Sequence, residues 1–234
     1  MNSYLAVGSH LPDIFPFASV SVFKFDEIHE GGEKFLTFLR KNHPDKIGLA
    51  IGMICHSVKY GADRFNPEIE NWLLTGRPEL KRSLSEKIAD CSSIDLKTAE
   101  TARLHNYLWS GVDLYLLKNK KNFINDLAKA HSEANLEKIS DVLSKAFHKK
   151  KDEVKTIVDQ FFNPFKSENL LFSVSGLTRI WKQVLAGLPE KDNVNEKKAI
   201  LLFENIYSLF EDQWQDILTT VINEVRAKTK KFTG

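Results

Sequence analysis

A short apolar stretch that turns abruptly polar places the strongest constraint on the fold. Residues 47–55, Ile-Gly-Leu-Ala-Ile-Gly-Met-Ile-Cys, are apolar throughout, and His56 follows directly. A membrane span needs about 20 apolar residues, so this shorter run predicts a core helix of a soluble protein. Gly48 and Gly52 are four residues apart, so they share one face and let a second helix approach closely.

The polar residues after this stretch predict a functional surface at the end of the helix. If the helix continues through Gly61, then His56, Tyr60 and Asp63 follow at i, i+4 and i+7 and share one face. A histidine and a carboxylate then lie together at the end of a buried helix.

The bulk composition excludes several classes of protein. The formal net charge of +2 gives no strong field that commits the chain to nucleic acid or to anionic lipid. Two cysteines, Cys55 and Cys91, are too few for a disulfide framework, which fits a reducing compartment. Residues 1–10 lack a positively charged region and hold only a very short apolar stretch, so they do not predict a secretory signal. We therefore expect a cytoplasmic protein.

The rest of the chain shows the periodicity of amphipathic helices, with apolar residues recurring at intervals of three and four. Asp26 is the expected N-cap of a helix that ends near Asn42, before Pro44. Ser92, three residues before Asp95, is the expected start signal of another helix. Further helices are expected at residues 66–75, 79–90, 96–117, 123–131, 136–147, 154–162, 170–185 and 194–230.

The segment from Ile14 to Phe25 is the one place where a strand competes with this pattern. Alternation from Val20 to Phe25 allows a short strand, but nearby prolines and the lack of a partner strand favour an extended loop. We therefore predict one all-α domain over residues 1–234. Its first part, residues 1–118, gathers histidines and carboxylates, and residues 119–234 mostly supply packing.

Histidine and aspartate recur together in the first part of the chain. Five of the seven histidines fall within the first 105 residues, and three of these have an aspartate at short range: His10 with Asp13, His56 with Asp63, and His105 with Asp113. Imidazole and carboxylate are ligands suited to zinc and related divalent metals, and helical bundles build such sites from several helices. The pattern favours a metal site, although each histidine taken singly is typical of a core or surface residue.

The order of these segments resembles the zinc-dependent phospholipase C and single-strand nuclease superfamily. The resemblance rests on Leu11-Pro12-Asp13, on His29 in the following helix, on the glycine-containing apolar helix that leads to His56 and Asp63, and on the segment from His105 to Asp113. It covers about the first half of the chain. It implies an all-α multi-helix bundle of the phospholipase C and nuclease type, in which a cluster of zinc ions activates water to hydrolyse phosphodiester bonds.

The resemblance also implies a set of site residues. The candidate metal ligands, for one or more zinc ions, are Asp13, His29, His56, Asp63, His105 and Asp113. Asp13 and Asp63 are in addition the candidate catalytic residues that orient the attacking water. A small phosphodiester or a lipid headgroup is the implied substrate, and there is no strong nucleic-acid signal.

Two other readings stay open. The first is a non-catalytic helical binding or structural protein that keeps the fold with a degenerate metal site. It is favoured by Trp109, which stands where related sequences often have glutamate, and by the seven-residue spacing from His56 to Asp63, which is usually four. The second is a phosphohydrolase with a single metal site of the HD type, but the adjacent His-Asp pair that it needs is absent from the chain.

Overall fold

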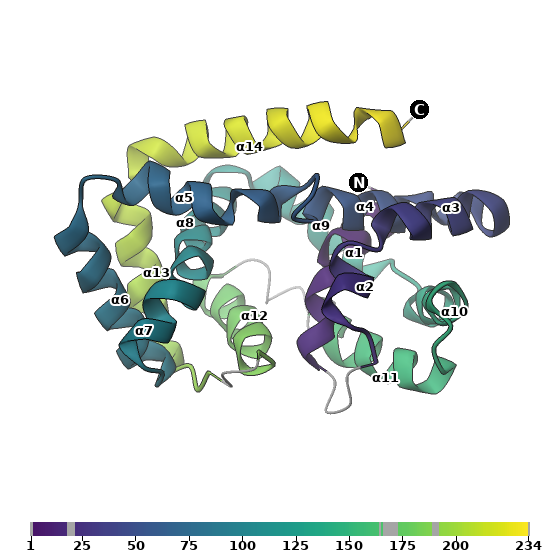
Figure 1. Ribbon diagram of the computed structural model, residues 1–234, viewed down its shortest axis with the longest axis horizontal. Coiled ribbons are helices and arrows are strands. Elements are labelled where there is room, and N and C mark those ends of the chain that lie inside the picture. Colours follow the sequence, from purple (N-terminus) through teal and green to yellow (C-terminus); the bar gives the residue numbers. More distant parts are fainter. Residues whose placement is uncertain (1, 18–21, 164, 166–172, 189–191, 234) are drawn as a thin grey trace. The chain divides into compact units, whose positions relative to one another are not determined.

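The computed structural model describes residues 2–17, 22–163, 165, 173–188 and 192–233 (Figure 1). These residues form helices and no strand, which confirms the all-α class. The chain folds as two compact units. The first comprises Met1–Asp63, Asn122–Glu168 and Glu224–Gly234, and the second comprises Arg64–Lys121 and Asn169–Asn223. Each unit therefore draws on both halves of the sequence, and the single domain stays a prediction.

Short helices build the first unit. Its elements are α1 (Ser3–His10), η1 (Leu11–Phe17), α2 (Phe25–His29), α3 (Gly32–Asn42), η2 (Pro44–Lys46), α4 (Ile47–His56), α9 (Lys121–Ser132), α10 (Leu136–Phe147) and α11 (Lys151–Phe162). The extended loop expected from Ile14 is wrong as far as Phe17, because these residues continue the 3-10 helix η1. Residues 18–21 lie outside the described part of the chain. The N-cap of α2 is Lys24 and not Asp26, and the backbone N–H of Lys24 donates to the Glu27 carboxylate (2.8 Å).

Helices α1 and α4 pack at unusually close range, as the glycine spacing predicts. A Cβ atom on Gly52 would lie 2.4 Å from the backbone nitrogen of Ser9, and one on Gly48 would lie 2.9 Å from that of Leu5. Gly8 of α1 faces α4 in the same way, since its Cβ would lie 2.3 Å from the carbonyl oxygen of Leu49. The backbones of the two helices touch where a side chain would normally separate them.

Helix α4 ends at His56 and does not continue to Asp63, so the face shared at i, i+4 and i+7 is a wrong prediction. Ser57 leaves the helical conformation with φ −50° and ψ 155°, and the 3-10 helix η3 (Ala62–Phe65) follows. The turn folds back onto the end of α4, because a Cβ on Gly61 would lie 2.2 Å from the carbonyl oxygen of Cys55. Asp63 therefore returns toward His56 by a turn.

The second unit contains the longer helices. Its elements are α5 (Asn66–Leu74), α6 (Pro78–Ser92), α7 (Leu96–Thr98), η4 (Ala99–Arg103, a π-helical turn), α8 (Leu104–Asn119), α12 (Val174–Ala186), α13 (Glu196–Leu209) and η6 (Glu211–Gln213). Helix α14 (Trp214–Thr229) starts in this unit and ends in the first, where η7 (Lys230–Phe232) follows it. The start signal expected at Ser92 is wrong, since Asp95 is the N-cap and accepts from the backbone N–H of Thr98 (2.9 Å).

The single helix expected over residues 194–230 is also wrong, because the chain breaks between α13 and α14. Phe210 has φ −131° and ψ 27°, and the Trp214 indole N–H donates to the carbonyl oxygen of Tyr207 (2.8 Å). Trp214 is fully buried, and a Cβ on Gly111 of α8 would lie 2.3 Å from its ring. Burial of this large ring in the core of the second unit favours the break.

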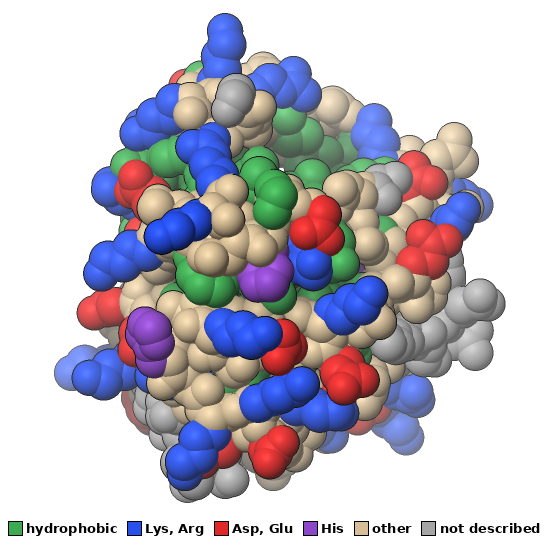
Figure 2. All heavy atoms as spheres, turned by 90° about the vertical axis from the view of Figure 1, so that its right-hand side faces the viewer, with side chains coloured by type: hydrophobic (Ala, Val, Ile, Leu, Met, Phe, Trp, Pro, Cys, Tyr) green, Lys and Arg blue, Asp and Glu red, His purple; other side chains and the backbone are tan. Residues whose placement is uncertain are grey.

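Two features of the surface bear on function. No helix in the described part of the chain is long and apolar enough to cross a membrane. On the face shown in Figure 2, Lys and Arg side chains are interspersed with Asp and Glu side chains. Side chains of the two signs are therefore mixed on that face (Figure 2).

Candidate metal site

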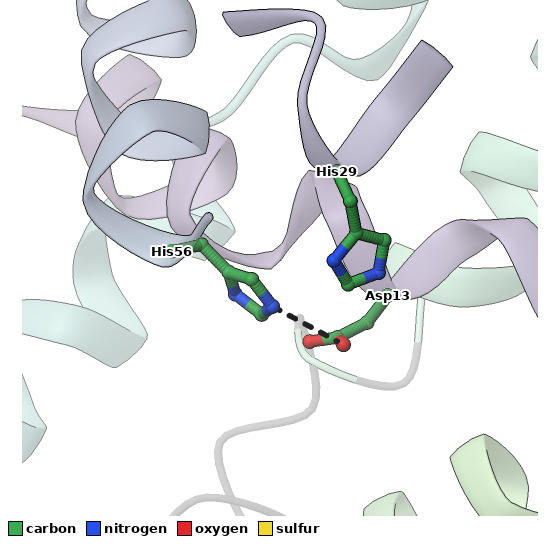
Figure 3. A group of neighbouring side chains, drawn as sticks. All are labelled: Asp13, His29 and His56. Atoms are coloured by element: carbon green, nitrogen blue, oxygen red, sulfur yellow. Dashed lines mark ion pairs between the residues drawn. The ribbon is translucent and has the colours of Figure 1, made fainter. Parts of the chain in front are cut away.

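Three side chains from separate elements of the first unit meet at one point (Figure 3). Asp13 comes from η1, His29 is the last residue of α2, and His56 is the last residue of α4. Each offers one ligand atom, and these atoms all lie within 4.8 Å of one another. Among the described residues this is the group of three or more potential ligands that can hold a metal ion.

Asp63 joins this group from the other side of the turn after α4. Its Oδ2 atom lies 3.2 Å from Nε2 of His56 and 3.4 Å from Nδ1 of His29. The Oδ1 atom of Asp13 lies 3.6 Å from the same Nε2 of His56. Asp63 therefore pairs with both imidazoles, whereas the group whose ligand atoms all lie within 4.8 Å of one another comprises three of the six predicted ligands, Asp13, His29 and His56.

The close packing of α1 and α4 fixes the orientation of the His56 ring. The Nδ1 atom of His56 lies 2.7 Å from the backbone carbonyl oxygen of Ser9, which can only accept, so Nδ1 carries the proton. This leaves Nε2 directed at the two carboxylates. A carbonyl that orients a histidine in this way is typical of the groups that support metal ligands.

His29 is held by its own helix and by burial. Its ring stacks on that of Phe25 with the centroids 4.1 Å apart, and it meets the His56 ring edge-on at 5.3 Å. Only 5% of His29 is exposed. The ring therefore has little freedom to leave the group.

The charges within the group shift its pKa values strongly. Burial alone lowers the pKa of His56, but the negative charges of Asp13 and Asp63 outweigh it and raise that pKa to about 10. Burial raises the pKa of Asp63, yet the neighbouring His56 and His29 hold it well below its usual range. The two carboxylates therefore favour the protonated, positively charged form of His56.

The distances fit a divalent metal ion. Ligand atoms at about 2.0–2.1 Å from a tetrahedral zinc ion lie about 3.3 Å from one another. The Asp13 oxygen lies 3.6 Å from Nε2 of His56, close to this value, and the ligand atoms of Asp13, His29 and His56 all lie within 4.8 Å of one another. Nitrogen and oxygen ligands in this mixture suit zinc and related metals, so the residues present fit such an ion.

The other two predicted ligands, His105 and Asp113, belong to α8 in the second unit. Asp113 accepts a hydrogen bond from the indole N–H of Trp181 (3.0 Å). Trp109, on the same helix, donates its indole N–H to the side-chain oxygen of Asn66 (2.7 Å). The assignment of His105 and Asp113 as ligands stays a prediction.

Sequence reasoning missed two groups near the site. The carbonyl of Ser9 has no signature in the sequence, because every residue carries one. His131, which the pattern did not single out, packs edge-on against His10 with the centroids 5.1 Å apart. It is 1% exposed, and neither of its ring nitrogens has a hydrogen-bond partner. Burial first, and then the charge of His10, lower its pKa to about 3.

Comparison with known proteins adds no relative to this picture. No protein-family model, no curated protein and no solved structure matches the chain. The resemblance to the zinc-dependent phospholipase C superfamily therefore stays a hypothesis that depends on the order and spacing of the residues named above.

Proposed function

We propose that the protein is a metal-dependent hydrolase that cleaves a phosphodiester with metal-activated water. The observation that carries the proposal is the convergence of Asp13, His29 and His56 from three elements, with Asp63 beside them. Three groups of the right chemistry have ligand atoms within 4.8 Å of one another, and a fourth, Asp63, pairs with both histidines. The order of these residues in the sequence, which resembles that of zinc-dependent phospholipases, supports the phosphodiester as the substrate.

In this proposal Asp13, His29, His56 and Asp63 hold a zinc or similar ion. Bound to such a site, a divalent ion lowers the pKa of its water toward about 7 and so supplies hydroxide at neutral pH. The Ser9 carbonyl keeps Nε2 of His56 directed inward by holding the proton on Nδ1.

The two aspartates then have different tasks. Asp63 faces both imidazoles and is the less exposed, with 24% of its side chain accessible against 30% for Asp13. Asp63 stays ionised in this setting and fixes the two rings. Asp13 comes from a different element and faces His56 at the longer distance of 3.6 Å, so we assign it the orientation of the attacking water.

The first test is the metal content of protein purified without chelator and without a polyhistidine tag. We expect one or more equivalents of zinc in the wild type and a loss in His56→Ala and His29→Ala. His148→Asn is the matched control, because His148 is exposed and lies outside the group, and asparagine tolerates its positive φ of 54°. Hydrolysis of a chromogenic aryl phosphodiester should disappear with chelator and return with zinc.

A second candidate function is a non-catalytic helical binding protein. It is favoured by the hydrogen bond between Trp109 and Asn66, which gives this tryptophan a structural role where a glutamate ligand is expected. It is also favoured by the pairing of His56 with Asp63, which balances charge within the protein. Wild-type protein that takes up no zinc even after incubation with it would select this second candidate.

A further inference from the structure

The loop that joins His56 to Asp63, residues 57–63, contacts the C-terminal turn η7 (Lys230–Phe232) within the first unit. The rings of Tyr60 and Phe232 meet edge-on with their centroids 5.2 Å apart. The Nζ atom of Lys231 lies 4.5 Å from the centroid of the Tyr60 ring and donates to its hydroxyl at 3.4 Å. We call residues 57–63 the site loop.

The C-terminal turn is itself firmly held. Phe232 is 9% exposed, and its carbonyl oxygen accepts from Nη2 of Arg40 in α3 (3.0 Å). The turn therefore offers the site loop a fixed surface, made from a segment about 170 positions away in the sequence.

The site loop is also held by hydrogen bonds within itself and to nearby helices. The backbone N–H of Gly61 donates to the carbonyl oxygen of Ser57 (2.8 Å), and that of Tyr60 donates to the Ser57 hydroxyl (3.2 Å). The backbone N–H of Val58 donates to the carboxylate of Glu30 (3.0 Å). These bonds define the turn, and Lys59 also donates to the Glu33 carboxylate of α3 (2.9 Å). Tyr60 joins the loop to the C-terminal turn.

We propose that the C-terminal turn is a clasp that holds the site loop in place, and that Tyr60 and Phe232 are positioning residues for Asp63. Asp63 reaches His56 and His29 only because the site loop folds back onto the end of α4. When Tyr60 is released, the site loop can move away from the end of α4. The Asp63 carboxylate then spends less time facing the two imidazoles. The effect on metal binding rests on the proposed function, whereas the effect on the loop does not.

The test has two readouts, one of which needs no metal. In Phe232→Ala we expect amide hydrogen exchange of residues 58–63 to rise by about tenfold, with α10 unchanged, because local opening becomes easier. Zinc affinity, measured well below the melting temperature, should fall by about tenfold as well, a loss of the size seen for groups that support metal ligands. Lys231→Ala should show smaller changes of the same kind, and Lys230→Ala, at an exposed neighbouring position, should show none.

Two results would overturn the proposal, the first by removing the clasp and the second by removing its role in positioning Asp63. One is unchanged exchange in the site loop of Phe232→Ala, and the other is faster exchange with unchanged zinc affinity. If Phe232→Ala fails to fold, Phe232→Leu keeps an apolar side chain and removes the ring contact with Tyr60. If the wild type binds no metal, the proposed function fails, and the exchange experiment still decides whether the clasp exists.

Discussion

The two units each contain a buried group of charged side chains, and the two groups are built differently. In the second unit, Nε and Nη2 of Arg103 each donate to Asp192 at 3.0–3.1 Å, and each of these two residues is 3% exposed. One cation meets one anion in a forked geometry that uses both carboxylate oxygens. In the first unit, the single Nε2 atom of His56 faces two carboxylates, while His29 faces one of them.

The difference indicates which group is structural. A pair whose charges and hydrogen bonds match one to one has no ligand atom to offer, so Arg103 and Asp192 serve to pin residue 192 to the helix that contains Arg103. The group in the first unit has no such one-to-one match, and its imidazole nitrogens and carboxylate oxygens are atoms that can also bind a metal ion. Substitutions in the second unit therefore test stability, and substitutions in the first unit test metal binding.

The largest effect on stability is expected from breaking the structural pair. Arg103→Leu leaves the Asp192 carboxylate buried without its partner, which should lower the free energy of unfolding by about 3–5 kcal/mol. Denaturant unfolding measures this loss. Lys198→Ala is the matched control: it removes an exposed partner of Asp90, which should cost at most about 1 kcal/mol. A loss for Arg103→Leu as small as that of the control would contradict the comparison.

The next largest effect is expected from a substitution that disturbs both the packing of α1 on α4 and the candidate metal site. Gly52→Ala places a Cβ 2.4 Å from the backbone nitrogen of Ser9, so α1 must move away from α4 and the carbonyl of Ser9 must leave His56. We expect a loss of about 1–3 kcal/mol in stability from overpacking. We also expect zinc affinity to fall by about 10–100-fold, as for other groups that orient a ligand.

Gly48→Ala distinguishes the loss of stability from the loss of zinc affinity. Its Cβ would meet Leu5, Asn2 and Tyr4 and not the Ser9 backbone, so it should cost stability while zinc affinity stays near that of the wild type. Equal losses of affinity in the two variants would show that the Ser9 carbonyl has no special role.

These residues also show how far the sequence predicts the site. The spacing of Gly48 and Gly52 predicts the close helix packing, because only glycine permits it and its period is that of a helix face. The approach of Asp63 to His56 was expected for the wrong reason. A seven-residue spacing fits a continuous helix as well as a turn, and only tertiary contacts, such as the hydrogen bond of Val58 with Glu30, select the turn.

Helix α1 shows why the rest could not be predicted. The segment 3–10 is short and mostly apolar, so its sequence shows little helical periodicity. Its helix is stabilised by packing on α4. The break at Phe210 has the same origin, since the apolar periodicity of α13 continues into α14 and the burial of Trp214 decides the turn.

The smallest effect on stability is expected at His131, a buried polar residue that is unlike both the Arg103–Asp192 pair and the group around His56. His131 is buried against His10, Phe162 and Phe165 and has no hydrogen-bond partner for either nitrogen. It avoids the cost of an unpaired charge by staying neutral, but its two nitrogens remain desolvated. His131→Phe keeps an aromatic ring among aromatic neighbours and should raise the free energy of unfolding by about 1 kcal/mol at pH 7.

The pH dependence of the free energy of unfolding tests the same variant more directly. The pKa of His131 is about 3 in the folded protein, against 6.5 when the residue is not perturbed, so between these values the unfolded chain binds the proton and the folded chain does not. Stability therefore falls as the pH drops from about 6.5 toward 3, by roughly 1 kcal/mol per pH unit. In His131→Phe this contribution is absent, so denaturant unfolding between pH 7 and about 4 should show a shallower loss. Parallel curves for the variant and the wild type would mean that the folded and unfolded chains bind the His131 proton equally, which would contradict the lowered pKa.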